Sequence, residues 1–177
     1  LPKKLIEICE YLFANSRRLS SVVIPNSVKA IRHWAFAECG NLKEIVLNEG
    51  LEEILSQAFY NSDIRSISIP STVRKIENDA FPYNRNLSEV NFMEGLEEIH
   101  YSAFNDCDAL TEVVLPATLT KCIHPFSDCD SLTTIISNAI VPAYTENNCP
   151  VTGTDLSKVV LKVPVWSIDE YKFAPGW

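Results

Sequence analysis

The chain has 177 residues, of which 46% are hydrophobic, enough to bury the core of one folded domain. Its 23 acidic residues outnumber its 15 lysines and arginines, and the resulting net charge of -8 disfavours binding to nucleic acids or to anionic membranes. No apolar run approaches the roughly 18 residues that cross a bilayer, so no segment is expected to insert into a membrane.

A repeat of 22 or 23 residues runs through most of the chain. In five of the six copies an isoleucine stands five residues before a phenylalanine, and Cys122 fills the isoleucine position of the sixth. A fixed period of this length is typical of a solenoid, in which each copy forms one turn. The repeated phenylalanines are Phe13, Phe36, Phe59, Phe81, Phe104 and Phe126.

Each copy predicts the same succession of elements. It opens with an alternating segment, such as LSSVVIP at residues 19–25 or LTEVVLP at 110–116, which predicts a half-buried strand. A turn follows, in which proline and glycine alternate from copy to copy, so a period of about 45 residues overlies the shorter one. A second short extended piece and a tight bend with the phenylalanine complete the unit. One copy cannot bury its apolar side alone, so the copies are predicted to stack into a continuous core.

The repeat breaks near the C-terminus. Residues 138–155, NAIVPAYTENNCPVTGTD, contain two prolines and one glycine and show little periodicity. The sequence therefore predicts a repeat array over 1–137, an irregular insertion over 138–155, and a capping strand with a tail over 156–177. The insertion either bridges to the cap or contributes to a binding site.

The repeat unit resembles a known family. IPNSVKAIRHWAFAECGNLKEIVL, at residues 24–47, is similar to the BspA-like leucine-rich repeats of bacterial and some protozoan surface proteins, and the closing KVVLKVPVWSIDEYKFAPGW resembles the cap of such arrays. The resemblance implies an α/β-type right-handed leucine-rich-repeat solenoid, mostly β with short helical or 3-10 bends and a parallel sheet on one face. It also implies secretion or surface display, adhesion to host or neighbouring-cell proteins, and no catalysis. Because the sequence starts within a repeat, we expect any leader to lie outside it.

The cysteines and histidines do not predict a reactive centre. Cys39, Cys107 and Cys129 follow the repeat phenylalanine by three residues, where other copies have serine or asparagine, so a small side chain that caps backbone groups is expected there. We expect free thiols, although Cys9 and Cys149 cannot be assigned from the sequence. The spacing of the three histidines matches no metal site, and no nucleophile or phosphate-binding motif occurs. The sequence therefore predicts no catalytic residue, metal or cofactor.

The outward strand positions form two predicted columns on the exposed sheet face. Their carboxylates complement a basic partner and their aliphatic side chains leave apolar surface exposed, which predicts a protein-binding site. The alternative is that β-branched residues simply suit strands and that the glutamates keep the sheet soluble. The candidate binding residues are Glu44, Glu89, Glu112, Val23, Val46, Val114 and Ile136. A second candidate surface on the bends consists of His33, Trp34, Tyr60, Tyr83 and Tyr101.

Together these features predict a non-catalytic protein-binding or adhesion module of a secreted or cell-surface protein. We expect a monomer that binds a matrix or cell-surface protein and neither nucleic acid nor membrane. Two alternatives stay open: a structural spacer that projects another domain, and an accessory module that recognises glycans.

Overall fold

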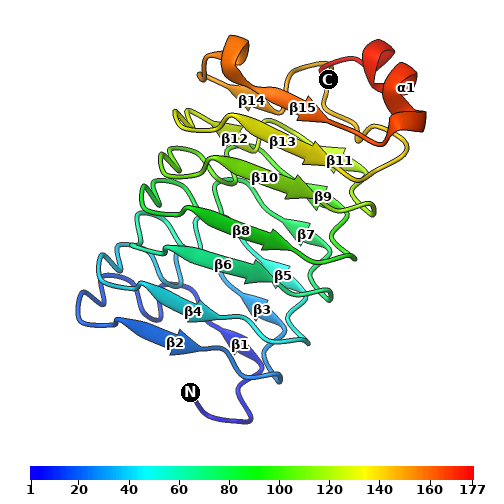
Figure 1. Ribbon diagram of the computed structural model, residues 1–177. Coiled ribbons are helices and arrows are strands. Elements are labelled where there is room, and N and C mark those ends of the chain that lie inside the picture. Colours follow the sequence, from blue (N-terminus) through cyan, green and yellow to red (C-terminus); the bar gives the residue numbers. More distant parts are fainter.

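The computed structural model describes all 177 residues and shows a solenoid in which successive repeats stack as parallel turns (Figure 1). Neighbouring strands in each of the two main sheets come from successive turns, and the pairing is parallel throughout. The predicted leucine-rich-repeat solenoid with a parallel sheet is thus confirmed. In addition, the second extended piece of each repeat forms a sheet of its own.

The longer sheet has seven strands, one from each turn. Successive residues of a strand point to opposite faces, so Val113 and Leu115 are buried while Glu112 and Val114 are exposed. The strands are β2 (Ser21–Val23), β4 (Glu44–Val46), β6 (Ser66–Ile69), β8 (Glu89–Phe92), β10 (Glu112–Leu115), β13 (Thr134–Ser137) and β15 (Val160–Lys162).

The shorter sheet has six strands of two residues each, and the second residue of every strand is a fully buried isoleucine or cysteine. These are the residues that the sequence places five positions before the repeat phenylalanine, apart from the shorter spacing in the last copy. The strands are β1 (Glu7–Ile8), β3 (Ala30–Ile31), β5 (Glu53–Ile54), β7 (Lys75–Ile76), β9 (Glu98–Ile99) and β11 (Lys121–Cys122).

The repeat phenylalanines stack face to face along the array and form the centre of the core. The ring centroids of Phe59 and Phe81 lie 4.8 Å apart with 6° between the ring planes, and Phe81 and Phe104 are 5.1 Å apart with 1°. From Phe36 to Phe126 these side chains are fully buried. Each ring therefore fills the space between two turns.

The bends that carry these phenylalanines are not helical. In each bend the residues two before and two after the phenylalanine have positive φ, as do Asp79 (φ 51°) and Tyr83 (φ 59°) around Phe81. A left-handed residue ends a right-handed helix and costs of order 1 kcal/mol, so the expected short helical turns do not form there. The backbone N–H groups of Asp79, Phe81 and Tyr83 instead donate to carbonyl oxygens of the next turn, at 2.7 to 2.9 Å, and these hydrogen bonds offset the conformational cost.

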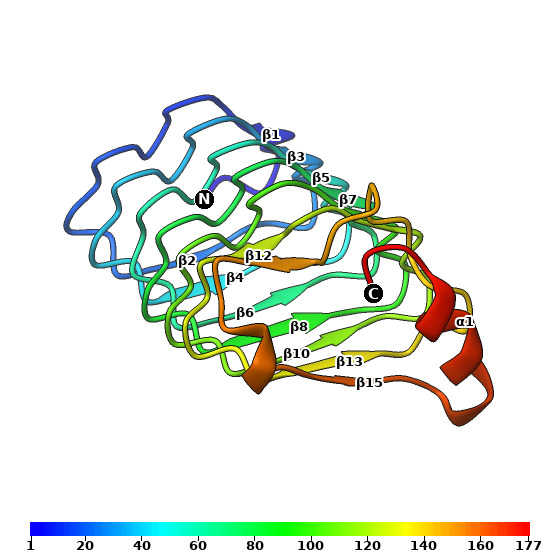
Figure 2. The same cartoon turned by 90° about the horizontal axis from the view of Figure 1, so that it is seen from above.

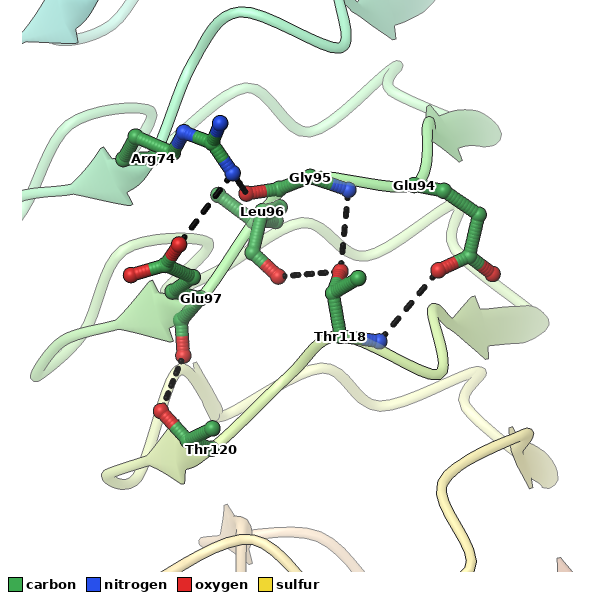
Figure 3. Close-up of polar contacts among 7 residues, drawn as sticks. All are labelled: Arg74, Glu94, Gly95, Leu96, Glu97, Thr118 and Thr120. Carbon is green, nitrogen blue, oxygen red and sulfur yellow. Dashed lines mark hydrogen bonds and ion pairs between the residues drawn. The ribbon is translucent and has the colours of Figure 1, made fainter.

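Two kinds of corner, one with a glycine and one with a proline, alternate along the array and explain the period of about 45 residues. Figure 3 shows the glycine corner at Gly95 with its contacts to Arg74 and Thr118. Gly95 has φ 120° and lies so close to the preceding turn that a Cβ atom would come 2.2 Å from the Ser71 carbonyl oxygen. The Gly95 N–H donates to Thr118 Oγ1 of the following turn (2.9 Å), and that hydroxyl donates to the Leu96 carbonyl (2.8 Å). Gly50 and Thr72 repeat this arrangement.

The glutamate before each of these glycines accepts hydrogen bonds from the proline corner of the next turn. Glu49 accepts hydrogen bonds from the Ser71 N–H (3.1 Å) and hydroxyl (3.0 Å), and these bonds hold the pKa of the Glu49 carboxyl below its usual range. Glu94 accepts in the same way from the Ala117 and Thr118 amides. Each glycine corner therefore contacts a proline corner on either side.

The ladder of small side chains after each phenylalanine satisfies backbone carbonyls inside the bends. Cys39 and Cys129 donate to the phenylalanine carbonyl of the previous turn at 3.1 Å each, as Ser62 does at 2.7 Å. All six cysteines are free thiols, including Cys9 and Cys149, which the sequence left unassigned. Burial raises the pKa of Cys129 to about 12 and that of Cys107 well above its ordinary value, so these thiols stay protonated.

Residues 138–155, expected to form an irregular insertion, follow the path of the turns below them. Tyr144 forms a parallel bridge with Lys121, and β14 (Val151–Thr152) pairs with β12 (Phe126–Ser127). The chain then enters β15, which pairs with β13. Backbone hydrogen bonding to the preceding turn keeps this segment in register despite its divergent sequence, so it completes a seventh turn.

The last residues fold over the end of the stack. They contain two 3-10 helices, Leu156–Lys158 and Val165–Ser167, and one helix, α1 (Ile168–Phe173). The Trp177 indole N–H donates to the Ala143 carbonyl at 2.7 Å, and the Tyr171 hydroxyl donates to the Ala139 carbonyl at 3.1 Å. With six residues, α1 is too short to cross a bilayer, and no other helix of the protein is long and apolar enough to do so.

Candidate functional site

The exposed face of the seven-stranded sheet carries the predicted columns in register. Glu44 pairs with Ser66 and Glu112 with Thr134 in the first column, while Val23 pairs with Val46 in the second. The first column consists of Ser21, Glu44, Ser66, Glu89, Glu112 and Thr134, and the second of Val23, Val46, Ser68, Asn91, Val114 and Ile136.

Three of the four apolar candidates are open to solvent. Val23 is 57% exposed, Val46 48% and Val114 40%. The fourth, Ile136, is half-buried, because β15 pairs with its strand and places Lys162 next to it. Among the candidate residues, the exposed apolar surface therefore lies on β2, β4 and β10, where the valines flank the acidic column.

The three candidate glutamates are exposed and almost free of partners within the chain. Glu89 accepts one hydrogen bond, from Asn91 Nδ2 on the same strand at 2.8 Å. Glu44 and Glu112 make neither a hydrogen bond nor an ion pair through their side chains, and no lysine or arginine lies in either column on the first six strands. These carboxylates are free to meet cationic groups of another molecule.

The small side chains of Ser66 and Ser68 leave a shallow depression in this face. It has a volume of about 180 Å³ and lies between Val46 on one side and Glu89 and Asn91 on the other. An aliphatic wall opposite a carboxylate suits a long side chain with an apolar stem and a charged head, because such a side chain buries its stem while its head stays hydrated.

The exposed face of the six-stranded sheet has a different electrostatic character. Charged side chains that directly precede its strands bind one another from turn to turn, as Lys29 binds Glu52 (2.7 Å) and Arg74 binds Glu97 (3.1 Å). Glu98 accepts a hydrogen bond from His100 Nε2 at 2.6 Å, and this bond, assisted by Lys121 and opposed by a smaller effect of burial, lowers the pKa of Glu98. Charges on this face are largely satisfied by the stack itself.

The aromatic residues of the bends, the second candidate surface, pack on one another. Tyr11 stacks on Trp34 with centroids 6.1 Å apart, Trp34 lies 5.2 Å from Tyr60, and Tyr60 lies 5.4 Å from Tyr83. Each contact covers ring surface on which a sugar would otherwise stack. This geometry favours a role in covering the edge of the core over glycan recognition.

The outward columns continue onto β15, which the sequence analysis did not include. Val160 pairs with Thr134 and Lys162 with Ile136, so one valine and one lysine extend the face by a further turn. The sequence predicts a capping strand within 156–177, but the divergent segment before it hides the repeat period that would place Val160 and Lys162 in the columns. No group of three or more His, Cys, Asp or Glu side chains is placed to hold a metal ion.

Similarity to solved structures supports the fold. The crystal structure of the pneumococcal vaccine antigen PcpA matches with a TM-score of 0.70 and 25% identity, over 78% of this chain and 39% of that one. A leucine rich cell surface protein from Faecalibacterium prausnitzii A2-165 matches with a TM-score of 0.54 and 25% identity, over 73% and 42% of the two chains. The T. pallidum leucine rich repeat protein matches with a TM-score of 0.50 and 25% identity, over 77% and 56%. The matches thus span between about two fifths and just over half of these relatives.

Sequence comparison agrees with the structural matches. No curated protein sequence matches the chain, but residues 6–133 match the BspA type leucine rich repeat region in six copies. This match covers well over half of the 177 residues. The chain therefore belongs to the family of BspA-type leucine-rich repeat proteins.

Proposed function

We propose that this chain is a non-catalytic protein-binding or adhesion module of a secreted or cell-surface protein, and that it binds through the exposed face of the seven-stranded sheet. The observation that carries the proposal is the lack of internal partners for Glu44 and Glu112 beside exposed valines. In and beside the six-stranded sheet, most carboxylates are bound within the stack, as Glu52 and Glu97 are, and Glu53 is the exposed exception.

The chemistry of this face defines the partner. Carboxylates at Glu44, Glu89 and Glu112 require a basic contact surface, and Val23, Val46 and Val114 require apolar groups between the cations. The depression at Ser66 and Ser68 offers a place for one basic side chain of the partner, with its stem on Val46 and its head at Glu89. A matrix or cell-surface protein with mixed basic and apolar surface has this chemistry.

The relatives support the location of the module. One of them is described as a leucine rich cell surface protein and another as a vaccine antigen. Surface display would place the sheet face in contact with proteins of a host or of a neighbouring cell.

The test compares two variants with equal charge changes. The face variant carries Glu44→Lys, Glu89→Lys and Glu112→Lys; the control carries Glu10→Lys, Glu53→Lys and Glu170→Lys, all exposed glutamates without ion pairs away from this face. Both changes move the net charge from -8 to -2, since each substitution adds two units. Wild type, face variant and control are immobilised and exposed to purified matrix and cell-surface proteins.

A partner retained by wild type and by the control but lost by the folded face variant supports binding through the sheet face. Equal retention by both variants would contradict the assignment of the site. If none of the three proteins retains a partner, the structural-spacer alternative is favoured. Circular dichroism of each variant establishes that it is folded.

A further inference from the structure

A further surface, distinct from the aromatic residues of the bends, lies at the C-terminal end of the stack, where β15 is the last strand of the seven-stranded sheet (Figure 1). The Val160 N–H donates to the Thr133 carbonyl at 2.8 Å, on the side of β13. Because successive residues of a strand direct their backbone groups to opposite sides, Leu161 directs its N–H and C=O away from the sheet. Figure 2 shows α1 beyond the end of β15, so the outer edge of this strand stays unpaired. Unpaired edges of this kind bind extended chain segments.

The core column beneath this edge is uncovered. Leu161 stacks on Ile135, and the exposed fraction rises from 4% at Ile135 to 36% at Leu161. A hollow of about 310 Å³ adjoins Leu161 and is lined mainly by apolar side chains, among them Leu156, Val159 and Trp177. A strand added at this edge would place one of its side chains over Leu161, as Leu161 itself lies over Ile135. That side chain must be apolar.

The charge at this edge is opposite to that of the protein as a whole. Lys162 follows Leu161 on the outward face, is exposed, and has no ion-pair partner. A groove of about 550 Å³ between β15 and α1 is lined by Lys162, Lys172 and five apolar residues, with no acidic side chain. Lys172 also binds Asp169, at 3.2 Å, so Lys162 is the cation left for a partner. A carboxylate beside the added apolar residue complements it.

We propose that the free edge of β15 is a docking site for an extended segment of a partner protein in which apolar residues alternate with acidic ones. The segment pairs with the Leu161 backbone, places an apolar side chain over Leu161, and directs a carboxylate to Lys162. This site adjoins the C-terminal end of the acidic sheet face, and the proposal does not depend on the function proposed for that face.

The test uses two blocked peptides as probes, acetyl-Thr-Glu-Val-Glu-Val-Thr-amide and the same sequence with lysine in place of each glutamate. Each is titrated into ¹⁵N-labelled protein while backbone and indole resonances are followed by NMR. The acidic peptide is expected to shift the amide resonances of residues 159–163 and the Trp177 indole resonance, and the basic peptide is not. Lys162→Glu is expected to weaken binding of the acidic peptide by about tenfold and to reverse the preference.

Lys43→Glu is the matched control, because Lys43 is exposed and directly precedes β4, five strands away in the same sheet. This variant should bind the acidic peptide as wild type does. Equal shifts with both peptides, or no shift at residues 159–163, would overturn the proposal. Concentration-dependent shifts of these resonances without peptide would assign the edge to a second copy of the chain, which also overturns it.

Discussion

The two sheets of this solenoid are built from the same repeats, yet their exposed faces use charge differently. Beside the six-stranded sheet, acidic and basic side chains that directly precede its strands bind one another from turn to turn, as Lys29 and Glu52 do at 2.7 Å. On the seven-stranded sheet, Glu44 and Glu112 have no such partner and lie beside exposed valines. One face therefore contributes its charges to stacking, while the other leaves its charges available to a second molecule.

The comparison shows why a stacked repeat can support binding without a pocket. Each turn repeats the same strand position, so any residue that recurs there becomes a column along the sheet. Where acidic and basic side chains alternate in a column, neighbouring turns form ion pairs with one another. A column with acidic side chains only cannot form such pairs. The difference in charge pairing between the faces follows from which residue types recur, since the strands of both sheets are parallel and in register.

The largest expected effect comes from the core that supports both faces. Phe81→Ala removes one ring from the stack between Phe59 and Phe104, where it is fully buried, and should lower the free energy of unfolding by about 3 to 5 kcal/mol. Thermal and urea denaturation measure the change. Phe173→Ala, at a side chain that is 83% exposed, is the control and should leave the melting temperature nearly unchanged. A Phe81→Ala protein as stable as wild type would contradict the repeat register.

An intermediate effect is expected at the corners that connect the two faces. Gly95→Ala places a Cβ atom 2.2 Å from the Ser71 carbonyl oxygen at a residue with φ 120°, and should destabilise the protein by roughly 1 to 3 kcal/mol through backbone strain. Gly40 provides the matched control because a Cβ atom there would meet nothing within 4 Å. Urea denaturation of both variants should show a loss at Gly95 alone. Equal effects at the two positions would argue against the close approach of the corners.

The smallest expected effect compares the contribution of one carboxylate on each face to the free energy of unfolding. A hydrogen bond from His100 holds the pKa of Glu98 below its usual range, so the ionised carboxylate is favoured in the folded state. This stabilisation is present above the unfolded pKa, roughly 4.3, and is lost as the pH falls through the lower folded pKa. Glu98→Gln should therefore lower the free energy of unfolding at pH 7, by less than about 1 kcal/mol because the pair is partly exposed to solvent.

The control for this measurement lies on the other face. Glu44→Gln should leave the stability unchanged at pH 7 and pH 3, since its side chain makes no hydrogen bond or ion pair. At pH 3 the difference between Glu98→Gln and wild type should shrink. If Glu44→Gln were as costly as Glu98→Gln at pH 7, the distinction between the two faces would not hold.

The sequence by itself determined the repeat, the columns and the family. The spacing of Phe36, Phe59 and Phe81 places these rings on one axis, and strand alternation decides which side chains point outward. Both patterns are periodicities along the chain, of 22 or 23 residues and of two residues, so they are visible without coordinates. The positions of Glu44, Glu89 and Glu112 in one exposed column follow from them.

Only the tertiary structure decided which charges have partners and how the array ends. The ion pairs between turns join side chains about one repeat apart in sequence, as with Arg74 and Glu97, and their formation depends on the stacking of two turns. The path of residues 138–155 likewise depends on hydrogen bonds to the turn below, such as that from the Cys122 N–H to the Tyr144 carbonyl. Contacts between turns are absent from any single repeat, and this is why the half-buried state of Ile136 and the free edge of β15 emerge only from the assembled stack.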